Sequence, residues 1–141
     1  EADSLLIDAA CMDLVRRPEA FDVIVAPNLF GDIVTDIGAI ITGSMGLASS
    51  ANINPDTSVP SMFEPTHGSA PDIAGQGIAN PMAQILTGAM MLRHLGEHTA
   101  AADVDAAVLE LLEQGEILTP DLGGSSTTES VGDAIAQLVS E

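Results

Sequence analysis

Asp32 and Asp36 form the first pair of side chains whose types and spacing could do chemistry. Residues four apart lie on one face of a helix, where two like charges repel each other. A hard divalent cation would relieve that repulsion, because Mg²⁺ and Mn²⁺ prefer oxygen ligands. The alternative is that Asp32 caps the helix and Asp36 is solvated. Paired aspartates also arise by chance in an acidic chain, so spacing alone leaves both interpretations open.

Asp8 is a third carboxylate of interest because of its neighbours. Leu5, Cys11 and Met12 lie three and four residues away, so a helix would place Asp8 on an apolar stripe. A carboxylate there is costly unless something compensates its charge. A metal ion, an arginine or a subunit boundary would each do so, and a side chain that reaches water at the edge of the stripe is equally consistent.

The segment from Glu64 to Asn80 is rich in glycine, alanine and proline. Small residues let backbone N–H groups approach a ligand, and the segment leads into a helix N-terminus, which favours anions. It is neither a GxGxxG fingerprint nor a P-loop, whose lysine this chain lacks. Asp72 could accept hydrogen bonds from two ribose hydroxyls, and His67 could contact a base, although an isolated histidine is more often structural. The residues predict a binding loop and leave its ligand open.

Hydrophobic spacing and turn residues predict the elements that must position these side chains. Residues 21–26 are expected to form a short buried strand, and a helix is expected to start near Gly31-Asp32. Strand, turn and helix in that order are typical of α/β folds, which bind ligands at the carboxyl ends of strands. Two more strands are expected at 46–48 and 61–64. Helices are expected over 4–17, capped by Ser4, over 81–95, capped by Asn80, and over 104–112, ending before Gly115. A last helix is expected to begin with Ser126 and Glu129 as its capping box.

The composition excludes several classes of partner. The 141 residues carry 21 acidic and three basic side chains, all arginine, for a net charge of -18. Nucleic acid and anionic membrane surfaces are excluded, because both require a basic footprint. Hydrophobic residues make up 46%, enough for a core. The scattered acids favour a salt-adapted surface, and an acidic face for a basic partner is the alternative.

The chain also lacks the sequence features of secreted and membrane proteins. No stretch approaches 18 consecutive apolar residues, and no basic segment precedes an apolar one as in a secretory signal. The single cysteine, Cys11, excludes an internal disulfide and fits a reducing compartment. These features predict a cytoplasmic protein.

Four segments together resemble the β-decarboxylating dehydrogenases, the isocitrate/isopropylmalate dehydrogenase family. They are residues 7–12, 28–36, 64–81 and 119–124, and the resemblance covers nearly the whole chain. It implies an α/β fold, the C-terminal part of the two-domain isopropylmalate/isocitrate dehydrogenase-like fold. Residues 1–43 would end the central, dimer-forming domain, and residues 44–141 would belong to the outer domain.

The resemblance also implies ligands for particular residues. Asp32 and Asp36 match aspartates that ligate Mg²⁺ or Mn²⁺ together with the substrate, and Asp8 matches one that reaches the same metal and substrate from the neighbouring subunit of a homodimer. The loop would bind the adenosine half of the cofactor through His67, Gly68, Ser69, Ala70, Asp72 and Asn80. An aspartate at position 72 favours NAD, because it would repel the 2′-phosphate of NADP.

The implied activity is the oxidation of a 2-hydroxy acid by NAD with loss of CO₂. Within the family we favour 3-isopropylmalate as substrate, with malate, tartrate, isocitrate and homoisocitrate as alternatives. The family's acid–base groups are a lysine and a tyrosine, and this chain contains neither. Its arginines (Arg16, Arg17 and Arg93) do not match the arginines that hold the substrate, and family members are more than twice as long. We therefore expect a C-terminal piece with no catalytic residue of its own, and a non-catalytic acidic interaction module is the alternative.

Overall fold

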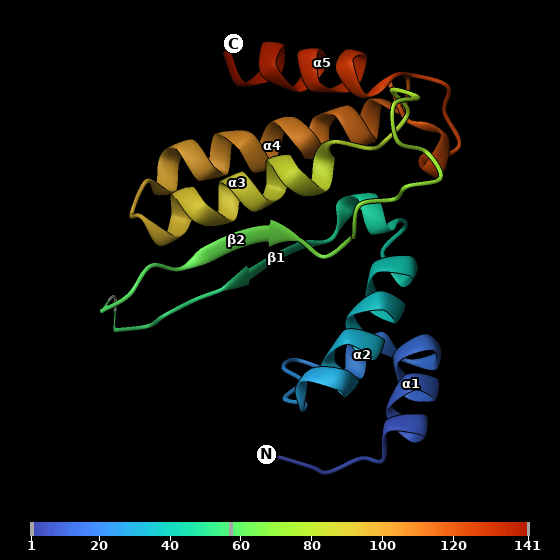
Figure 1. Ribbon diagram of the computed structural model, residues 1–141, viewed down its shortest axis with the longest axis vertical. Coiled ribbons are helices and arrows are strands. Elements are labelled where there is room, and N and C mark those ends of the chain that lie inside the picture. The colour runs from blue at the N-terminus through green and yellow to red at the C-terminus, as the bar shows by residue number, and fades with distance from the viewer. Residues whose placement is uncertain (1, 57, 141) are drawn as a thin grey trace. The chain divides into compact units, whose positions relative to one another are not determined.

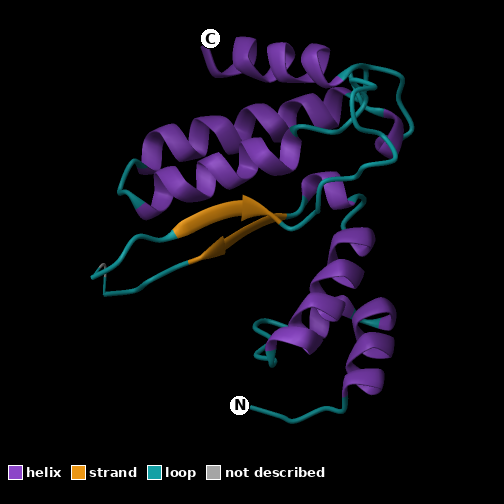
Figure 2. Ribbon diagram, in the orientation of Figure 1, coloured by secondary structure: helices purple, strands orange, loops and turns teal. Residues whose placement is uncertain are grey.

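The computed structural model describes residues 2–56 and 58–140, which divide into two compact units at Gly43 and Ser44 (Figures 1 and 2). Within the described residues, the first unit contains two α-helices and the second contains a hairpin and three α-helices, in addition to short 3-10 turns. Their assignment to the central and outer domains of a larger enzyme stays a prediction.

The first unit is built from α1 (Ile7–Arg16) and α2 (Asn28–Ile41). Helix α1 begins after Leu6 rather than after Ser4, so the predicted Ser4 cap is wrong. Asp13 accepts a hydrogen bond from Arg17 at 2.7 Å, and this contact holds the pKa of Asp13 below its usual value. Among the described residues of this unit only Val34 and Ala39 are buried, so much of its apolar surface is exposed.

The predicted strand over 21–26 does not form. The segment follows a 3-10 turn at Pro18–Ala20 and has no ladder partner among the described residues. Val23 is 83% exposed and Val25 94% exposed. A buried strand depends on neighbouring strands and on cover for its faces, and its own side chains cannot supply either.

The second unit begins with a short antiparallel hairpin, β1 (Ser49–Asn52) and β2 (Met62–Pro65), in which Ser49 pairs with Pro65. Residues 46–48 were expected as a strand, but Met45–Leu47 form a 3-10 turn instead. The Ser44 hydroxyl accepts a hydrogen bond from the Gly46 N–H at 2.9 Å, and this cap favours the turn. The prediction of a strand near 61–64 is confirmed by β2.

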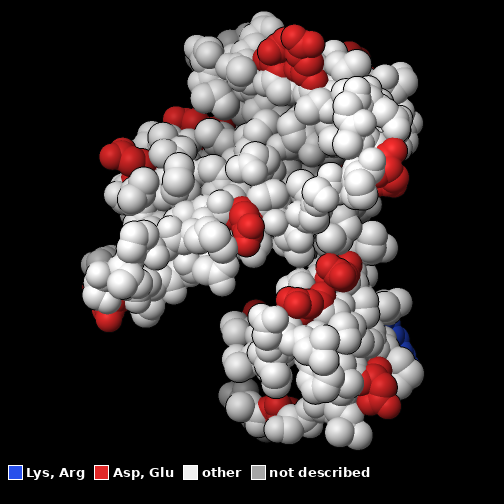
Figure 3. Space-filling model, in the orientation of Figure 1, with Lys and Arg blue, Asp and Glu red and all other residues white. Residues whose placement is uncertain are grey.

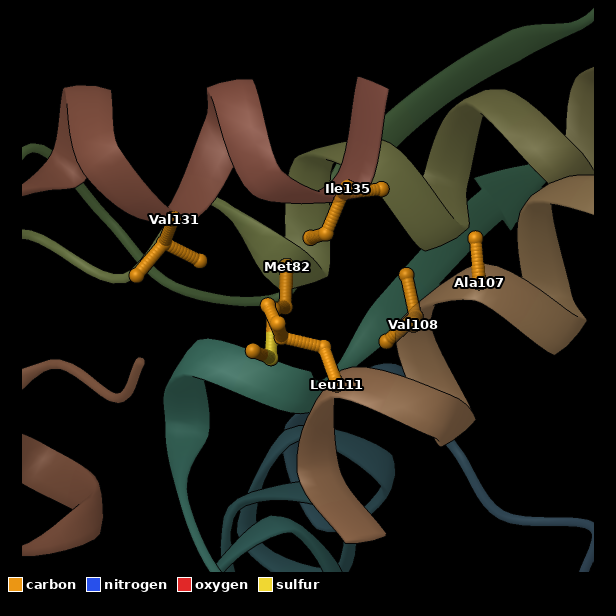
Figure 4. Packing of buried hydrophobic residues seen from close by; sticks show 6 residues of the cluster. All are labelled: Met82, Ala107, Val108, Leu111, Val131 and Ile135. Atoms are coloured by element: carbon orange, nitrogen blue, oxygen red, sulfur yellow. The ribbon is translucent and has the colours of Figure 1, made fainter. Parts of the chain in front are cut away.

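Three helices supply the core of this unit: α3 (Met82–His94), α4 (His98–Gln114) and α5 (Thr128–Ser140). Figure 4 shows the apolar side chains that they bring together, and Figure 1 shows the hairpin beside α3. The buried members of this cluster are Met82, Ala107, Val108, Leu111, Val131 and Ile135. Gly115 ends α4 in a left-handed conformation, with φ +69°.

The start of α5 corrects the predicted capping box. The Thr127 hydroxyl accepts a hydrogen bond from the Ser130 N–H at 3.1 Å, so Thr127 is the capping residue. The N–H of Ser126 instead donates to the carbonyl of Leu118 at 2.8 Å. The residue expected as the cap is thus hydrogen-bonded through its backbone to the loop around residue 118.

Acidic side chains occur as separate patches on the face shown in Figure 3, in agreement with their scattered positions in the sequence. Within residues 2–56 and 58–140, no helix is long and apolar enough to cross a membrane.

Candidate functional site

The loop predicted to bind a ligand connects β2 to α3 and is fixed at its far end. The side chain of Asn80 accepts a hydrogen bond from the Met82 N–H at 3.0 Å, which satisfies a free donor at the start of α3. Thr128 makes two more contacts, from its N–H to the carbonyl of Gly77 at 2.8 Å and from its hydroxyl to the carbonyl of Ala79 at 2.5 Å. The first residues of α3 and α5 therefore hold the loop.

The backbone of the loop folds tightly upon itself. Ala70 has φ +42°, a left-handed value that is uncommon for a residue with a Cβ atom. Its carbonyl accepts a hydrogen bond from the Ile73 N–H at 3.1 Å, and the amide of Gln76 donates to the carbonyl of Asp72 at 2.8 Å. These local contacts give the loop a defined shape without a ligand.

A cavity of about 870 Å³ lies between the loop and the residues opposite it. Five of the predicted cofactor residues line it: His67, Gly68, Ser69, Ala70 and Asn80. The opposite wall comes from residues 44–46, Pro120, Asp121 and Thr128. The volume lies within the range of small-molecule sites, and the wall combines apolar groups with a few polar ones, as such sites do.

Asp72 and His67 occupy different positions in this site. Asp72 is exposed and is not among the lining residues, although its neighbour Ile73 is. His67 is half-buried, and its Nδ1 lies 3.0 Å from the carbonyl oxygen of Gly68. The contact with the carbonyl fixes the ring against its own loop, so the His67 side chain has a structural role as well. Ligand contacts of both residues stay predictions.

Asp121 is a site residue that the sequence reasoning missed. Its Oδ2 accepts hydrogen bonds from the Ser44 hydroxyl and from the Asn80 amide, the latter at 3.0 Å. Its Oδ1 accepts one from the Thr119 hydroxyl at 2.5 Å. Residues 119–124 carried part of the family resemblance, but nothing in that segment indicates that its aspartate contacts residues 41 and 77 positions away.

These contacts determine the charge state of Asp121. Burial raises the pKa of its carboxyl group, but the hydrogen bonds from Ser44, Thr119 and Asn80 favour the ionised form more strongly. The net result is a pKa below the usual value for aspartate. Asp121 is therefore an anion at neutral pH, and its exposed carboxylate accepts hydrogen bonds from three neutral side chains.

The three predicted metal ligands lie in the first unit and are all exposed. Helix α2 starts at Asn28 after Pro27, so Asp32 lies in the second turn and is not the cap. Asp32 and Asp36 keep the predicted one-face spacing. Asp8 lies in the first turn of α1 and its carboxylate accepts a hydrogen bond from the Ala9 N–H at 2.8 Å.

A divalent cation fits the chemistry of the Asp32 and Asp36 pair, since both side chains offer charged oxygens to solvent. The described part of one chain brings together no group of three histidine, cysteine or acidic residues that could hold a metal. The expected third ligand, Asp8, would come from a second subunit, so this single chain does not test the set. The metal site stays a prediction.

A family model described as isocitrate/isopropylmalate dehydrogenase matches residues 1–135. The chain belongs to this family. Its α/β fold is that of the family, as the solved structures show: an isocitrate dehydrogenase from Methylococcus capsulatus superimposes with a TM-score of 0.90 at 46% identity, over 96% of this chain and 40% of the other. The family resemblance seen in the sequence is thus confirmed.

Similar family members differ in the substrates that their names give. A 3-isopropylmalate dehydrogenase from Thermobifida fusca is 55% identical over all of this chain and 39% of its own length. A probable tartrate dehydrogenase/decarboxylase from Bacillus subtilis is 56% identical over 96% of this chain and 38% of its own. The chain spans about two fifths of the length of these relatives. Their sequence identities to it are nearly equal, so identity does not favour one named substrate over the other.

Proposed function

We propose that the protein carrying this chain is an NAD-dependent, β-decarboxylating 3-isopropylmalate dehydrogenase of leucine biosynthesis, active as a cytoplasmic homodimer. The observation that carries the proposal is the cavity formed by the family's loop, with five of the six expected cofactor residues in its wall. NAD-dependent malate, tartrate, isocitrate and homoisocitrate dehydrogenases of the same family are the alternatives.

The residues of the loop support binding of the adenosine half of NAD. Gly68, Ser69 and Ala70 line the cavity, and their small size would let a ligand approach the backbone. Asp72 lies beside the lining residue Ile73, where a carboxylate would accept hydrogen bonds from the ribose hydroxyls and repel a 2′-phosphate. The charge of this residue and the absence of lysine together favour NAD over NADP.

The carboxylates of the first unit support binding of substrate through a metal. Asp32 and Asp36 would hold Mg²⁺ or Mn²⁺ from one subunit, and Asp8 would approach the ion and the substrate from the other. A metal held there would supply positive charge that stabilises negative charge on the substrate oxygen during decarboxylation. These 141 residues contain no lysine or tyrosine, so we assign them binding groups and no proton-transfer group.

Steady-state assays of the full-length protein test the activity. With NAD and Mg²⁺ or Mn²⁺, 3-isopropylmalate should give NADH and CO₂ with a higher kcat/KM than malate, tartrate, isocitrate or homoisocitrate. A higher value for another of these acids would replace the substrate and keep the reaction. If none of the five is turned over, the enzymatic proposal is wrong.

Assays of the 141 residues alone test whether they contain binding groups but no proton-transfer group. This chain should bind NAD in a calorimetric titration and should reduce none of it, because it lacks proton-transfer groups. Reduction of NAD above background would contradict the assignment. Absence of NAD binding would favour the alternative of a non-catalytic acidic module.

A further inference from the structure

Asp121 joins three segments that are far apart in the sequence. Its carboxylate receives hydrogen bonds from Ser44 before the hairpin, from Asn80 at the end of the loop, and from Thr119 in its own turn. Ser44 and Asn80 lie 77 and 41 residues away from Asp121. Each of these donors is neutral, so the carboxylate supplies the charge that strengthens all three hydrogen bonds.

The Asn80 side chain is held at both ends. Its amide nitrogen donates to Asp121, and its amide oxygen accepts from the Met82 N–H at 3.0 Å. The two contacts fix the orientation of the amide and connect the loop to the first turn of α3. Asn80 lines the cavity, so a change at Asp121 would alter the cavity wall.

Gly46 shows how closely these segments approach one another. A Cβ atom at position 46 would lie 2.6 Å from the Cβ atom of Asn80 and 2.8 Å from the Asp121 Oδ2. Contacts this short do not occur without displacement of the neighbouring atoms. The junction therefore requires glycine at 46 and leaves no space for the loop to shift toward residues 44–46.

The charge of Asp121 is opposite to that expected for a contact with the phosphate groups of a nucleotide. A carboxylate in the wall of a nucleotide-binding cavity repels the phosphate groups of the ligand and so weakens binding. Its presence there is explained if the carboxylate has another role. We propose that Asp121 is a positioning residue, which fixes Asn80 and the turn at residues 44–46 so that the loop is preformed for the adenine nucleotide. The inference rests on the cofactor site proposed above.

The effect of removing the charge distinguishes positioning from simple electrostatics. Asp121→Ala should weaken binding of ADP-ribose to the full-length protein about tenfold, since three charge-assisted hydrogen bonds are lost. The matched control is Asp103→Ala, which removes an exposed carboxylate of α4 and changes the net charge equally. Without the repulsion of that carboxylate, the control should bind ADP-ribose as tightly as the parent or slightly more tightly.

Two further variants separate the hydrogen bonds from the charge. Asp121→Asn keeps an oxygen for Ser44 and Asn80, and the Thr119 hydroxyl can turn to accept, so affinity should recover to within about threefold of the parent. Gly46→Ala keeps every charge and should weaken binding by displacing Asn80. These two variants also carry the test if Asp121→Ala fails to fold.

Hydrogen exchange provides a readout that needs no ligand. In Asp121→Ala the amides of Gly46 and Met82 should exchange faster, while the amides of α4 keep the protection seen in the parent. Parent-like affinity and exchange in Asp121→Ala would overturn the role of Asp121 and leave the cofactor site standing. Failure of the parent to bind ADP-ribose would overturn the cofactor site and the role of Asp121 together.

Discussion

At the scale of single residues, function in this chain depends on where carboxylates lie. All four of Asp121, Asp72, Asp32 and Asp36 are exposed, but the carboxylate of Asp121 already accepts hydrogen bonds from Ser44, Asn80 and Thr119. An exposed carboxylate remains available to a ligand, and its interaction with that ligand depends on the charge that the ligand brings. The ribose hydroxyls and a divalent cation are two such ligands, and each leads to a prediction.

The choice of cofactor should depend on Asp72. NADP would place a phosphate dianion near this carboxylate, so the full-length enzyme should prefer NAD by at least about a hundredfold. The double variant Asp72→Lys with Ile73→Tyr should erode or reverse the preference, because it replaces repulsion by attraction. Specificity constants for both cofactors, measured at one salt concentration, provide the comparison. Equal use of NAD and NADP by the parent would remove Asp72 from the site.

Metal affinity should depend on Asp32. Asp32→Asn replaces a charged ligand by a neutral one, so Mn²⁺ should bind the full-length enzyme about tenfold or more weakly, with a matching loss of turnover. Asp103→Asn is the control, because Asp103 is exposed on α4 in the other unit. A calorimetric Mn²⁺ titration gives the affinities. An unchanged titration in Asp32→Asn would count against the metal site.

At the scale of elements, α3, α4 and α5 position the loop. The loop begins after β2 and ends at α3, and Thr128 at the start of α5 binds two of its carbonyl groups. The apolar side chains between these helices keep those anchoring points together. A defect in the core should therefore affect both stability and the site.

Leu111 and Leu109 offer a matched pair on α4. Leu111 is 1% exposed within the core and Leu109 is 57% exposed. Leu111→Ala should lower the free energy of unfolding by about 2–5 kcal/mol, because it leaves a cavity. Leu109→Ala should change it by no more than about 0.5 kcal/mol. Urea unfolding followed by circular dichroism measures both, and equal effects would contradict the packing described here.

At the scale of the whole molecule, charge is the dominant property. The formal net charge is -18, and the described residues form two ion pairs, Arg17 with Asp13 and Arg93 with Asp105. Three of the four side chains are 40% exposed or more, so both pairs contribute little to stability. Repulsion among the remaining acids therefore opposes folding at low ionic strength.

Salt should stabilise the chain. Raising KCl from about 0.1 M to about 1 M shortens the screening length from about 10 Å to about 3 Å, which weakens the repulsion. The Tm measured by circular dichroism should rise over this range. Sucrose at equal osmolality is the control, since it favours compact states without screening charge. A Tm that is constant or falls with KCl would favour an acidic face reserved for a basic partner.

The sequence by itself determined the properties that depend on neighbouring residues or on the overall composition and charge. Apolar spacing predicted helices over 81–95 and 104–112, because helix periodicity is local. The structure has them at Met82–His94 and His98–Gln114, so the second begins earlier than predicted. Small residues identified the loop, and the total charge predicts that nucleic acid is not a partner. The motifs identified the family, which the match over residues 1–135 confirms.

The tertiary structure decided what depends on distant partners. The apolar run at 21–26 has the composition of a strand, but without a neighbouring strand it stays unpaired and exposed. Thr127 rather than Ser126 caps α5 through its hydroxyl, and the Ser126 N–H donates to the carbonyl of the distant residue Leu118. The role of Asp121 depends on hydrogen bonds to residues 41 and 77 positions away. Local patterns carry no information about such contacts, since only chain folding brings the partners together.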